Sequence, residues 1–320
     1  MVRPHNRMIL LILAAAFVAA CAPAPPPPTA LPQTPAPSGA AATPAAPTAM
    51  VPPKASPERR DSTMIGPRAE DRAIVATPSL PAGNESSNRG RSEDGKESYA
   101  HVSTSNTVRD IVDHPAFQGF GQFILPLELG YDADMPLTRV GSLLPYHSNV
   151  KPDEVVHSIN TMIDEVNDDQ TIFYDYYTDA QKGKDPDKAS TGLFFFRGNP
   201  GAPFAVVCPG GGFAYVGSVH EGFPHAIALS REGYNAFVLQ YRVGSERIAT
   251  EDLAAALSYI FENAATLEVS TKDYSLWGSS AGARMAARIG SYGAAAYGGE
   301  KLPRPSTVVM AYTGHTDFPE

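Results

Sequence analysis

The sequence has few of the residues and motifs on which several common protein classes depend. Only two of its 320 residues are cysteine, Cys21 and Cys208, and they lie in unlike contexts, so neither a disulfide framework nor a zinc finger is expected. Lys and Arg number 25 against 34 Asp and Glu, and the net charge of −9 argues against a nucleic-acid partner. The sequence contains neither G-x-G-x-x-G nor G-x-x-x-x-G-K-[ST], which excludes the usual glycine-rich phosphate loops.

A long apolar run is also missing at the N-terminus. The run from Met8 to Phe17 follows Arg3 and Arg7 and is too short to span a bilayer comfortably, so a signal peptide over residues 1–20 is expected rather than a transmembrane helix. The tetrapeptide VAAC that ends at Cys21 resembles the lipobox of bacterial lipoproteins. The resemblance implies that Cys21 is lipidated. It also implies a lipid-anchored protein of the bacterial cell envelope, with the outer membrane preferred and the domain facing the periplasm or the exterior. The alternative is an ordinary signal peptide with a chance cysteine.

Composition predicts where a folded domain begins. Residues 22–60 are dominated by Pro and Ala, and residues 61–100 are mostly polar and charged. Residues 21–100 are therefore expected to be a disordered linker, extended where Pro is frequent. Aromatic and β-branched residues become regular only in residues 101–320, which have the size of one α/β domain. Within it, residues 101–170 lack a clean period and are expected to be either a cap over the site or an N-terminal extension packed on the sheet.

Strand and helix patterns alternate through the rest of the domain. Strands are expected at 171–177, 192–196, 204–208, 235–241, 274–277 and 306–312, and helices at 219–232, 251–267 and 281–293. Repeated strand–helix–strand order predicts an α/β fold with a doubly wound, mostly parallel sheet.

One motif in this pattern has a chemical meaning. Gly278 to Gly282 reads GSSAG and matches G-x-S-x-G directly after an apolar strand and before a helix of small residues. This is the placement that a nucleophile elbow requires, with Ser280 held above the sheet at a helix N-terminus. The alternative interpretation is a Gly/Ser-rich helix start without chemistry.

A second glycine motif points to the same chemistry. Cys208 to Phe213 reads CPGGGF directly after another apolar strand. It resembles the HGGG oxyanion loop of hormone-sensitive-lipase-like and acetylesterase-type α/β-hydrolases, with Pro209 in place of the histidine. The resemblance implies that the N–H groups of Gly211, Gly212 and Ala281 would form the oxyanion hole.

The resemblance implies a serine hydrolase that cleaves carboxylic esters through an acyl-enzyme on Ser280, without a metal or organic cofactor. Its substrate would be a small-molecule or polymer-borne ester, and its membrane contact would be the lipid anchor. Two alternatives stay open at this point. One is a peptidase related to prolyl oligopeptidase, and the other is a non-catalytic envelope lipoprotein or an inactive truncated remnant.

The match is incomplete at the C-terminal end. In this family the acid and then the histidine of the triad follow the nucleophile along the chain, but only 38 residues follow Ser280. We therefore expect the domain to lack the last strands and helices of the fold and the chain to be a fragment of a longer protein. Asp317 is the candidate acid, and His315 is disfavoured as the base because it lies only two residues away. His220 and His225 are expected to be helix-surface or packing residues.

Overall fold

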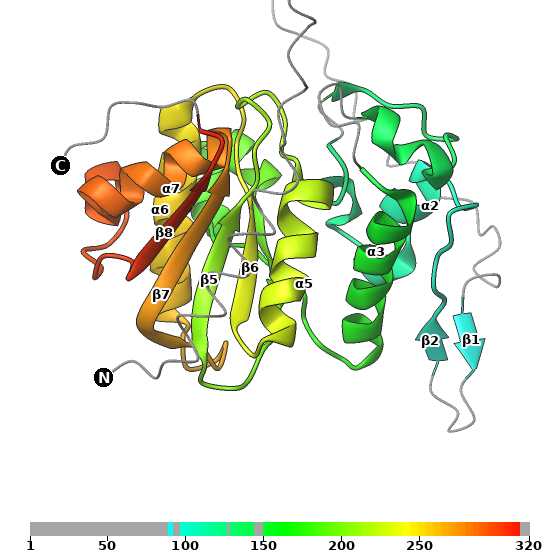
Figure 1. The fold of residues 1–320 in the computed structure, drawn as a ribbon, viewed down its shortest axis with the longest axis horizontal. Helices are drawn as coiled ribbons and strands as arrows, with labels where there is room; N and C mark the ends of the chain where they lie inside the picture. Colours follow the sequence, from blue (N-terminus) through cyan, green and yellow to red (C-terminus); the bar gives the residue numbers. More distant parts are fainter. Residues whose placement is uncertain (1–88, 92–96, 127–128, 144–149, 314–320) are drawn as a thin grey trace, which may run out of the picture. The chain divides into compact units, whose positions relative to one another are not determined.

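The computed structural model describes residues 89–91, 97–126, 129–143 and 150–313 (Figure 1). All of them belong to one of the two compact units into which the chain divides. The predictions for the signal peptide, Cys21 and most of the linker lie outside the described residues. The same is true of His315 and Asp317.

A mixed six-stranded sheet forms the centre of this unit, in the order β3-β4-β6-β5-β7-β8. Its strands are β3 (Phe173–Tyr174), β4 (Gly192–Phe196), β5 (Pro203–Cys208), β6 (Asn235–Gln240), β7 (Ser270–Ser279) and β8 (Thr307–Ala311). The strands β6, β5, β7 and β8 run parallel to their neighbours, whereas β4 is antiparallel to both β3 and β6. The sequence-based prediction of a mostly parallel α/β sheet is confirmed.

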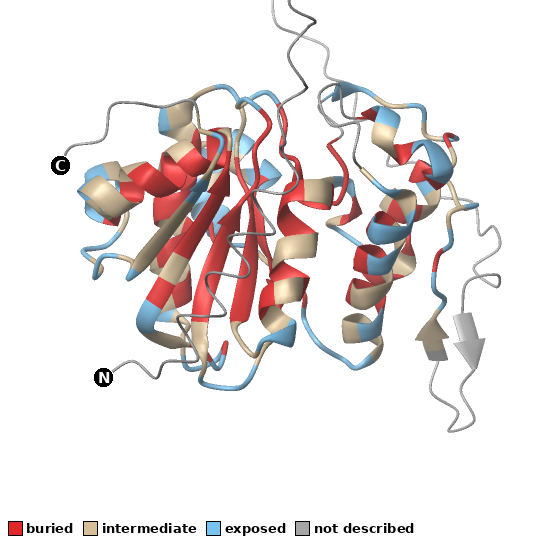
Figure 2. Ribbon diagram, viewed as in Figure 1, coloured by how far each residue is buried: buried red, intermediate tan, exposed pale blue. Residues whose placement is uncertain are grey.

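Helices cover both faces of the sheet, as Figure 1 shows. The main ones are α3 (Pro152–Asn167), α5 (Phe223–Arg231), α6 (Glu246–Glu262) and α7 (Ala281–Tyr292), and shorter ones are α2 (Val108–Val112) and α4 (Asp179–Lys184). Successive strand residues point to opposite faces, so Phe194 packs in the cluster that contains α5 and α3, and Phe195 packs in the cluster that contains α6 and α7. The buried residues of both clusters concentrate on the strands (Figure 2).

The segment before the sheet is held to α3 by side-chain amides. Asn160 donates to the carbonyl oxygen of Val102 at 2.9 Å and accepts from its N–H at 2.9 Å. One face further along the helix, Asn167 makes the same pair of bonds with Tyr99, at 3.0 and 2.7 Å. A two-stranded sheet of β1 (Arg89–Arg91) and β2 (Glu97–Tyr99) leads into this segment. Because α3 in turn packs on α5, residues 97–167 join the core on one face of the sheet; a role as a cap stays a prediction.

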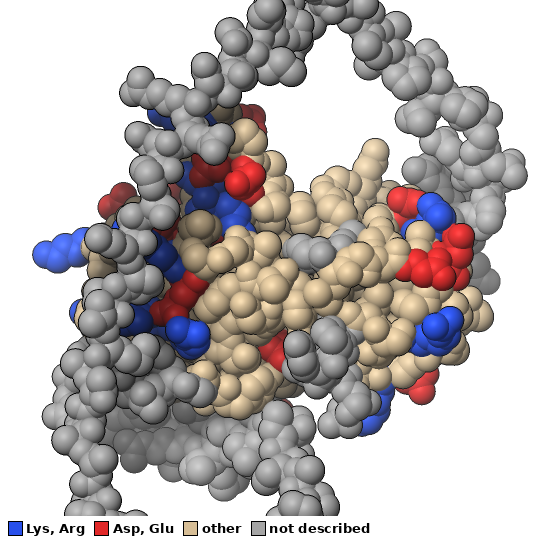
Figure 3. Space-filling view, turned by 90° about the horizontal axis from the view of Figure 1, so that it is seen from above, with Lys and Arg blue, Asp and Glu red and all other residues tan. Residues whose placement is uncertain are grey.

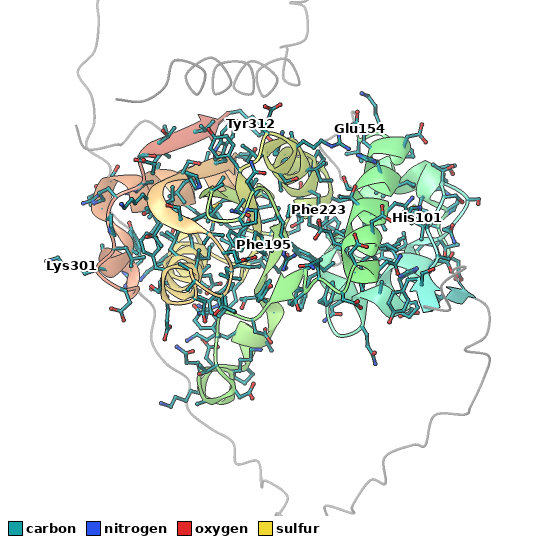
Figure 4. The ribbon with its side chains drawn as sticks, turned by 90° about the horizontal axis from the view of Figure 1, so that it is seen from below. His101, Glu154, Phe195, Phe223, Lys301 and Tyr312 are labelled. Carbon is teal, nitrogen blue, oxygen red and sulfur yellow. The ribbon has the colours of Figure 1, made fainter. Side chains whose placement is uncertain are left out.

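Interior aromatic residues and peripheral charged residues are separated in the described chain. In Figure 4, Phe195 and Phe223 lie in the interior, whereas His101, Glu154 and Lys301 lie at the periphery. In the part of the chain that the structure describes, no helix has the length and apolar character needed to cross a membrane.

The register of the parallel strands decides what meets at one edge of the sheet. Cys208 is paired with Gly278, and Ser279 is paired with Ala311. The glycine loop after β5, the turn after β7 and the end of β8 therefore lie side by side at the carboxyl edge, which is where open α/β sheets place their sites. Figure 3 views the molecule from above, the side on which α7 begins; uncharged residues occupy the centre of this face and charged residues lie toward its rim.

Candidate active site

The turn between β7 and α7 holds Ser280 in a strained backbone conformation. Ser280 has φ 49° and ψ −113° and is the N-cap residue of α7. Its N–H donates to the carbonyl oxygen of Ala311 at 2.9 Å, which ties the turn to the end of β8. A non-glycine residue in this region costs about 1–3 kcal/mol, and such residues cluster at functional sites. The geometry is that of a sharp strand-to-helix elbow.

The glycines on either side of Ser280 are required by close backbone contacts. A Cβ atom on Gly278 would lie 2.4 Å from the carbonyl oxygen of Gly282. A Cβ atom on Gly282 would lie 1.9 Å from the carbonyl oxygen of Cys208 and 2.7 Å from that of Pro209. The motif is therefore a structural necessity of this turn, and it brings the start of α7 directly against the end of β5.

The glycine loop after β5 is held in place by three separate hydrogen bonds. The hydroxyl of Tyr241 donates to the carbonyl oxygen of Pro209 at 2.9 Å. The N–H of Gly210 donates to Oε2 of Glu221 at 2.6 Å, and the carbonyl oxygen of Gly210 accepts from the N–H of Gly217 at 2.9 Å. Gly211 has φ 139°, and a Cβ there would lie 1.9 Å from the carbonyl oxygen of Tyr215. This conformation is open only to glycine.

The N–H groups expected to form the oxyanion hole are left with bonding capacity. In the described part of the chain, no acceptor receives the N–H groups of Gly211, Gly212 or Ala281. A first-turn helix N–H has no intrahelical partner, so Ala281 follows the general rule. Unused donors beside a strained serine match the arrangement that stabilises a developing oxyanion, and the assignment of these three groups stays a prediction.

A buried carboxylate next to the loop was not anticipated from the sequence. Glu221 belongs to the π-helical turn η6 (Ser218–Gly222) and is 5% exposed. Its Oε1 accepts a hydrogen bond from the hydroxyl of Tyr312, just after β8, and lies 3.3 Å from Nε2 of His220. Burial acts to raise the pKa of Glu221, but His220, Tyr312 and the N–H of Gly210 outweigh it, so the pKa lies below the usual range. Glu221 is therefore ionised at neutral pH.

The two histidines after the glycine loop are more buried than expected. The side chain of His220 is only 10% exposed, so it is a packing residue and not a surface one. His225 lies in α5, and burial, helped by the nearby His220 and opposed by Glu221, lowers its pKa to about 4. The sequence allowed either a surface or a packing position, because a periodic pattern does not show the π-helical turn that rotates these residues inward.

Acidification is expected to destabilise the folded protein through His225. Unfolded His225 takes up a proton as pH falls through about 6.5, while the folded form stays neutral down to about 4. Stability is thus fully present above the unfolded pKa and declines as pH falls toward 4, by up to about 3 kcal/mol. Urea unfolding between pH 4 and 7 measures this slope, and His225→Gln should flatten it. An unchanged slope in His225→Gln would show that another group is responsible.

The base that would activate Ser280 is not found in the described part of the chain, where no side chain accepts a hydrogen bond from its hydroxyl. The predicted candidates His315 and Asp317 fall in residues 314–320, outside the described residues. Among the described residues no group of His, Cys, Asp and Glu side chains is placed to hold a metal ion. Cys208 is buried, and burial raises the pKa of its thiol.

An ion-pair cluster lies at the end of the neighbouring strand β6. Arg242 donates through Nε and Nη2 to the fully buried Asp252, at 3.0 and 2.7 Å, and through Nη1 to Asp185 at 2.7 Å. The hydroxyl of Tyr177 also donates to Asp252, at 2.7 Å. The cluster fixes the segment that follows β3 against the end of β6.

A cavity of about 530 Å³ opens beside this cluster. It is lined by Phe123, Pro186, Asp187, Ala189, Ser190, Arg242, Val243 and Ile248. The N–H of Gly244, next to the lining residue Val243, donates to the carbonyl oxygen of Phe213 at 2.7 Å, so the cavity adjoins the glycine loop. Ser280 is not among its lining residues.

The strand order, the antiparallel β4, the elbow at Ser280 and the glycine loop are matched by a comparison with known families. Residues 197–303 match the family model BD-FAE. The chain has an α/β-hydrolase fold. The matched range contains both the glycine loop and the elbow, and it ends before β8.

Relatives of this α/β-hydrolase chain include characterised esterases. An acetylxylan esterase from Xylanibacter ruminicola is 28% identical over 97 residues, which are 30% of this chain and 20% of the relative. The chain thus spans a fifth of the length of that curated relative and about half of the length of the solved structures that it matches.

Two solved structures illustrate the second group. MGS-M1, an α/β-hydrolase enzyme from a Medee basin deep-sea metagenome library, is 28% identical, with 38% of this chain and 50% of that chain covered and a TM-score of 0.33. The acetyl ester-xyloside bifunctional hydrolase of Caldicellulosiruptor lactoaceticus is 24% identical, with 38% and 47% covered and a TM-score of 0.33.

Proposed function

We propose that this chain belongs to a serine hydrolase that cleaves carboxylic esters through an acyl-enzyme on Ser280. The observation that carries the proposal is the strained elbow, in which Ser280 sits at a helix N-terminus beside N–H groups of Gly211, Gly212 and Ala281 that have no acceptor among the described residues. Strain of this kind is maintained only when the surroundings impose it. Here the close approach of Gly282 to Cys208 does so.

In the proposed reaction, the hydroxyl oxygen of Ser280 attacks the ester carbonyl and a base takes its proton. The carbonyl oxygen becomes an anion, which the N–H groups of Gly211, Gly212 and Ala281 stabilise; removing one such donor costs about 100- to 1000-fold in turnover. The alcohol leaves, and water then releases the acid from the acyl-enzyme. Asp317 remains the proposed acid of the triad.

Acetyl esters are the proposed substrate class, and acetylated xylan is the first polymer to test. The support is the acetylxylan esterase relative, whose matched residues are 28% identical to this chain. An esterase acting on such a polymer would need to meet it outside the cytoplasm, which fits the proposed lipid anchor at Cys21 and a place in the bacterial cell envelope.

The test of this function is covalent labelling. The full-length product of the gene is treated with a fluorophosphonate, which reacts with activated serines, and digested for mass spectrometry, while hydrolysis of p-nitrophenyl acetate is followed in parallel. Label on the peptide that contains Ser280, together with hydrolysis, supports the proposal. Absence of both would favour a non-catalytic binding domain.

A further inference from the structure

Glu221 joins three elements that surround Ser280. Its carboxylate accepts the N–H of Gly210 from the glycine loop and the hydroxyl of Tyr312 from the residue after β8, and it lies beside His220 in the turn η6. Only 5% of the residue is exposed. The bond to Gly210, at 2.6 Å, is short and charge-assisted, a kind of hydrogen bond roughly twice as strong as a neutral one.

The carboxylate is also a close neighbour of the serine. A Cβ atom on Gly210 would lie 2.5 Å from Oε2 of Glu221 and 3.0 Å from Cβ of Ser280. Gly210 is therefore enclosed between the two side chains. Its N–H points to Glu221, which leaves the following N–H groups of Gly211 and Gly212 for another acceptor.

The sign of the charge limits what Glu221 can do here. A carboxylate close to a developing oxyanion repels it, so Glu221 is unsuited to stabilise that charge directly. Burying a carboxylate is also costly unless donors compensate it, and three donors from three elements do so here. A buried, compensated carboxylate with one strong bond to the glycine loop fits an anchoring role.

We propose that Glu221 is a positioning residue that locks the glycine loop against the elbow, through the N–H of Gly210, so that Gly211 and Gly212 keep the place in which they can receive an oxyanion. The catalytic part of this inference rests on the proposed function, whereas the anchoring part does not. It predicts that loss of the carboxylate loosens residues 209–217 and lowers turnover more than substrate binding.

Hydrogen–deuterium exchange of the full chain tests the anchor without any need for activity. In Glu221→Ala, amide exchange in residues 209–217 should rise at least about tenfold, because the N–H of Gly210 loses its acceptor and the loop opens more often. In Glu221→Gln, the amide oxygen can still accept this N–H, and exchange should stay near that of the wild type. The matched control is Glu165→Ala, which removes another carboxylate of the core, paired with Arg197 in α3. It should leave residues 209–217 unchanged.

Steady-state kinetics with p-nitrophenyl acetate test the catalytic consequence. Glu221→Ala should lower kcat by about 10- to 100-fold, the size expected when a catalytic group is misplaced by about 1 Å, while KM changes by less than about threefold. Glu221→Gln should recover most of kcat. Glu165→Ala should keep kcat even where it lowers thermal stability.

Each outcome decides between the parts of the inference. Unchanged exchange at residues 209–217 in Glu221→Ala, or an equal rise in Glu165→Ala, would overturn the anchor. Faster exchange with unchanged kcat would overturn the catalytic consequence, and an equal loss of kcat in Glu221→Gln would show that the charge matters and not the bond to Gly210. A wild-type protein without Ser280 labelling would reject the proposed function and with it the catalytic consequence, while the exchange result would still decide the anchor.

Discussion

Replacement of Ser280 by Ala is expected to abolish fluorophosphonate labelling and to lower ester hydrolysis by about a million-fold, the scale seen when a serine hydrolase loses its nucleophile. Ser280 supplies the only atom that would form the acyl-enzyme, so no neighbouring group can substitute for it. The variant should fold, because alanine removes one hydroxyl and no side chain in the described part of the chain depends on that hydroxyl. Initial rates with p-nitrophenyl acetate, and mass spectrometry of the labelled protein, measure the effect.

The adjacent serine supplies the matched control. Ser279 is the last residue of β7, is 1% exposed, and differs from Ser280 by having no positive φ. Ser279→Ala should retain the label and hydrolyse p-nitrophenyl acetate within a few-fold of the wild type. If hydrolysis survived Ser280→Ala, the esterase assignment would be wrong. Loss of the label in Ser279→Ala but not in Ser280→Ala would instead move the reactive serine by one position.

The sequence predicted the parts of the fold that have strong local patterns. The strand Gly192–Phe196 has the predicted bounds, because five consecutive apolar or glycine positions between Thr191 and Arg197 can be satisfied only by burial on both faces. Both glycine motifs also lie at strand ends as predicted. In each, a backbone contact too close for a Cβ leaves glycine as the only solution, and such positions can be recognised without a structure.

Other features depend on contacts that no local pattern contains. The helix expected over 251–267 instead runs from Glu246 to Glu262. Ser245, whose hydroxyl accepts the N–H of Ile248, starts it earlier, and such an N-cap is a pattern that could have been found. The antiparallel direction of β4 could not be found in this way, because direction is decided by pairing with β6 and not by composition.

Glu221 shows why one half of the site was missed. In sequence it is an acidic residue in a polar stretch before Phe223, which indicates a solvated helix start. In the structure a π-helical turn, a rare element that is frequent at functional sites, turns it toward Gly210 and Tyr312. The partners lie 11 and 91 positions away in the chain, so the role of this carboxylate could be recognised only after the fold had brought them together.

Gly282→Ala is expected to have the largest effect on stability among single substitutions at the elbow. Its Cβ would lie 1.9 Å from the carbonyl oxygen of Cys208 and 2.7 Å from that of Pro209, and neither backbone group can move without separating α7 from β5. Overpacking against backbone costs at least about 3 kcal/mol in free energy of unfolding. Urea unfolding followed by the fluorescence of Trp277, the single tryptophan of the chain, measures the loss from a buried position two residues before Ser279.

Gly183→Ala is the matched control, because it makes the same chemical change at a helical glycine with no atom within 4 Å of the added Cβ. Alanine there should raise stability by up to about 1 kcal/mol, since glycine is the poorer helix former. Equal behaviour of the two variants would mean that the approach of α7 to β5 is looser than it is drawn here. The same contact holds the glycine loop beside Ser280, so Gly282→Ala should also slow fluorophosphonate labelling at urea concentrations where the protein remains folded. A variant that lost stability but kept the wild-type labelling rate would show that the loop and the elbow are positioned independently, and that their closeness at the sheet edge does not depend on this glycine.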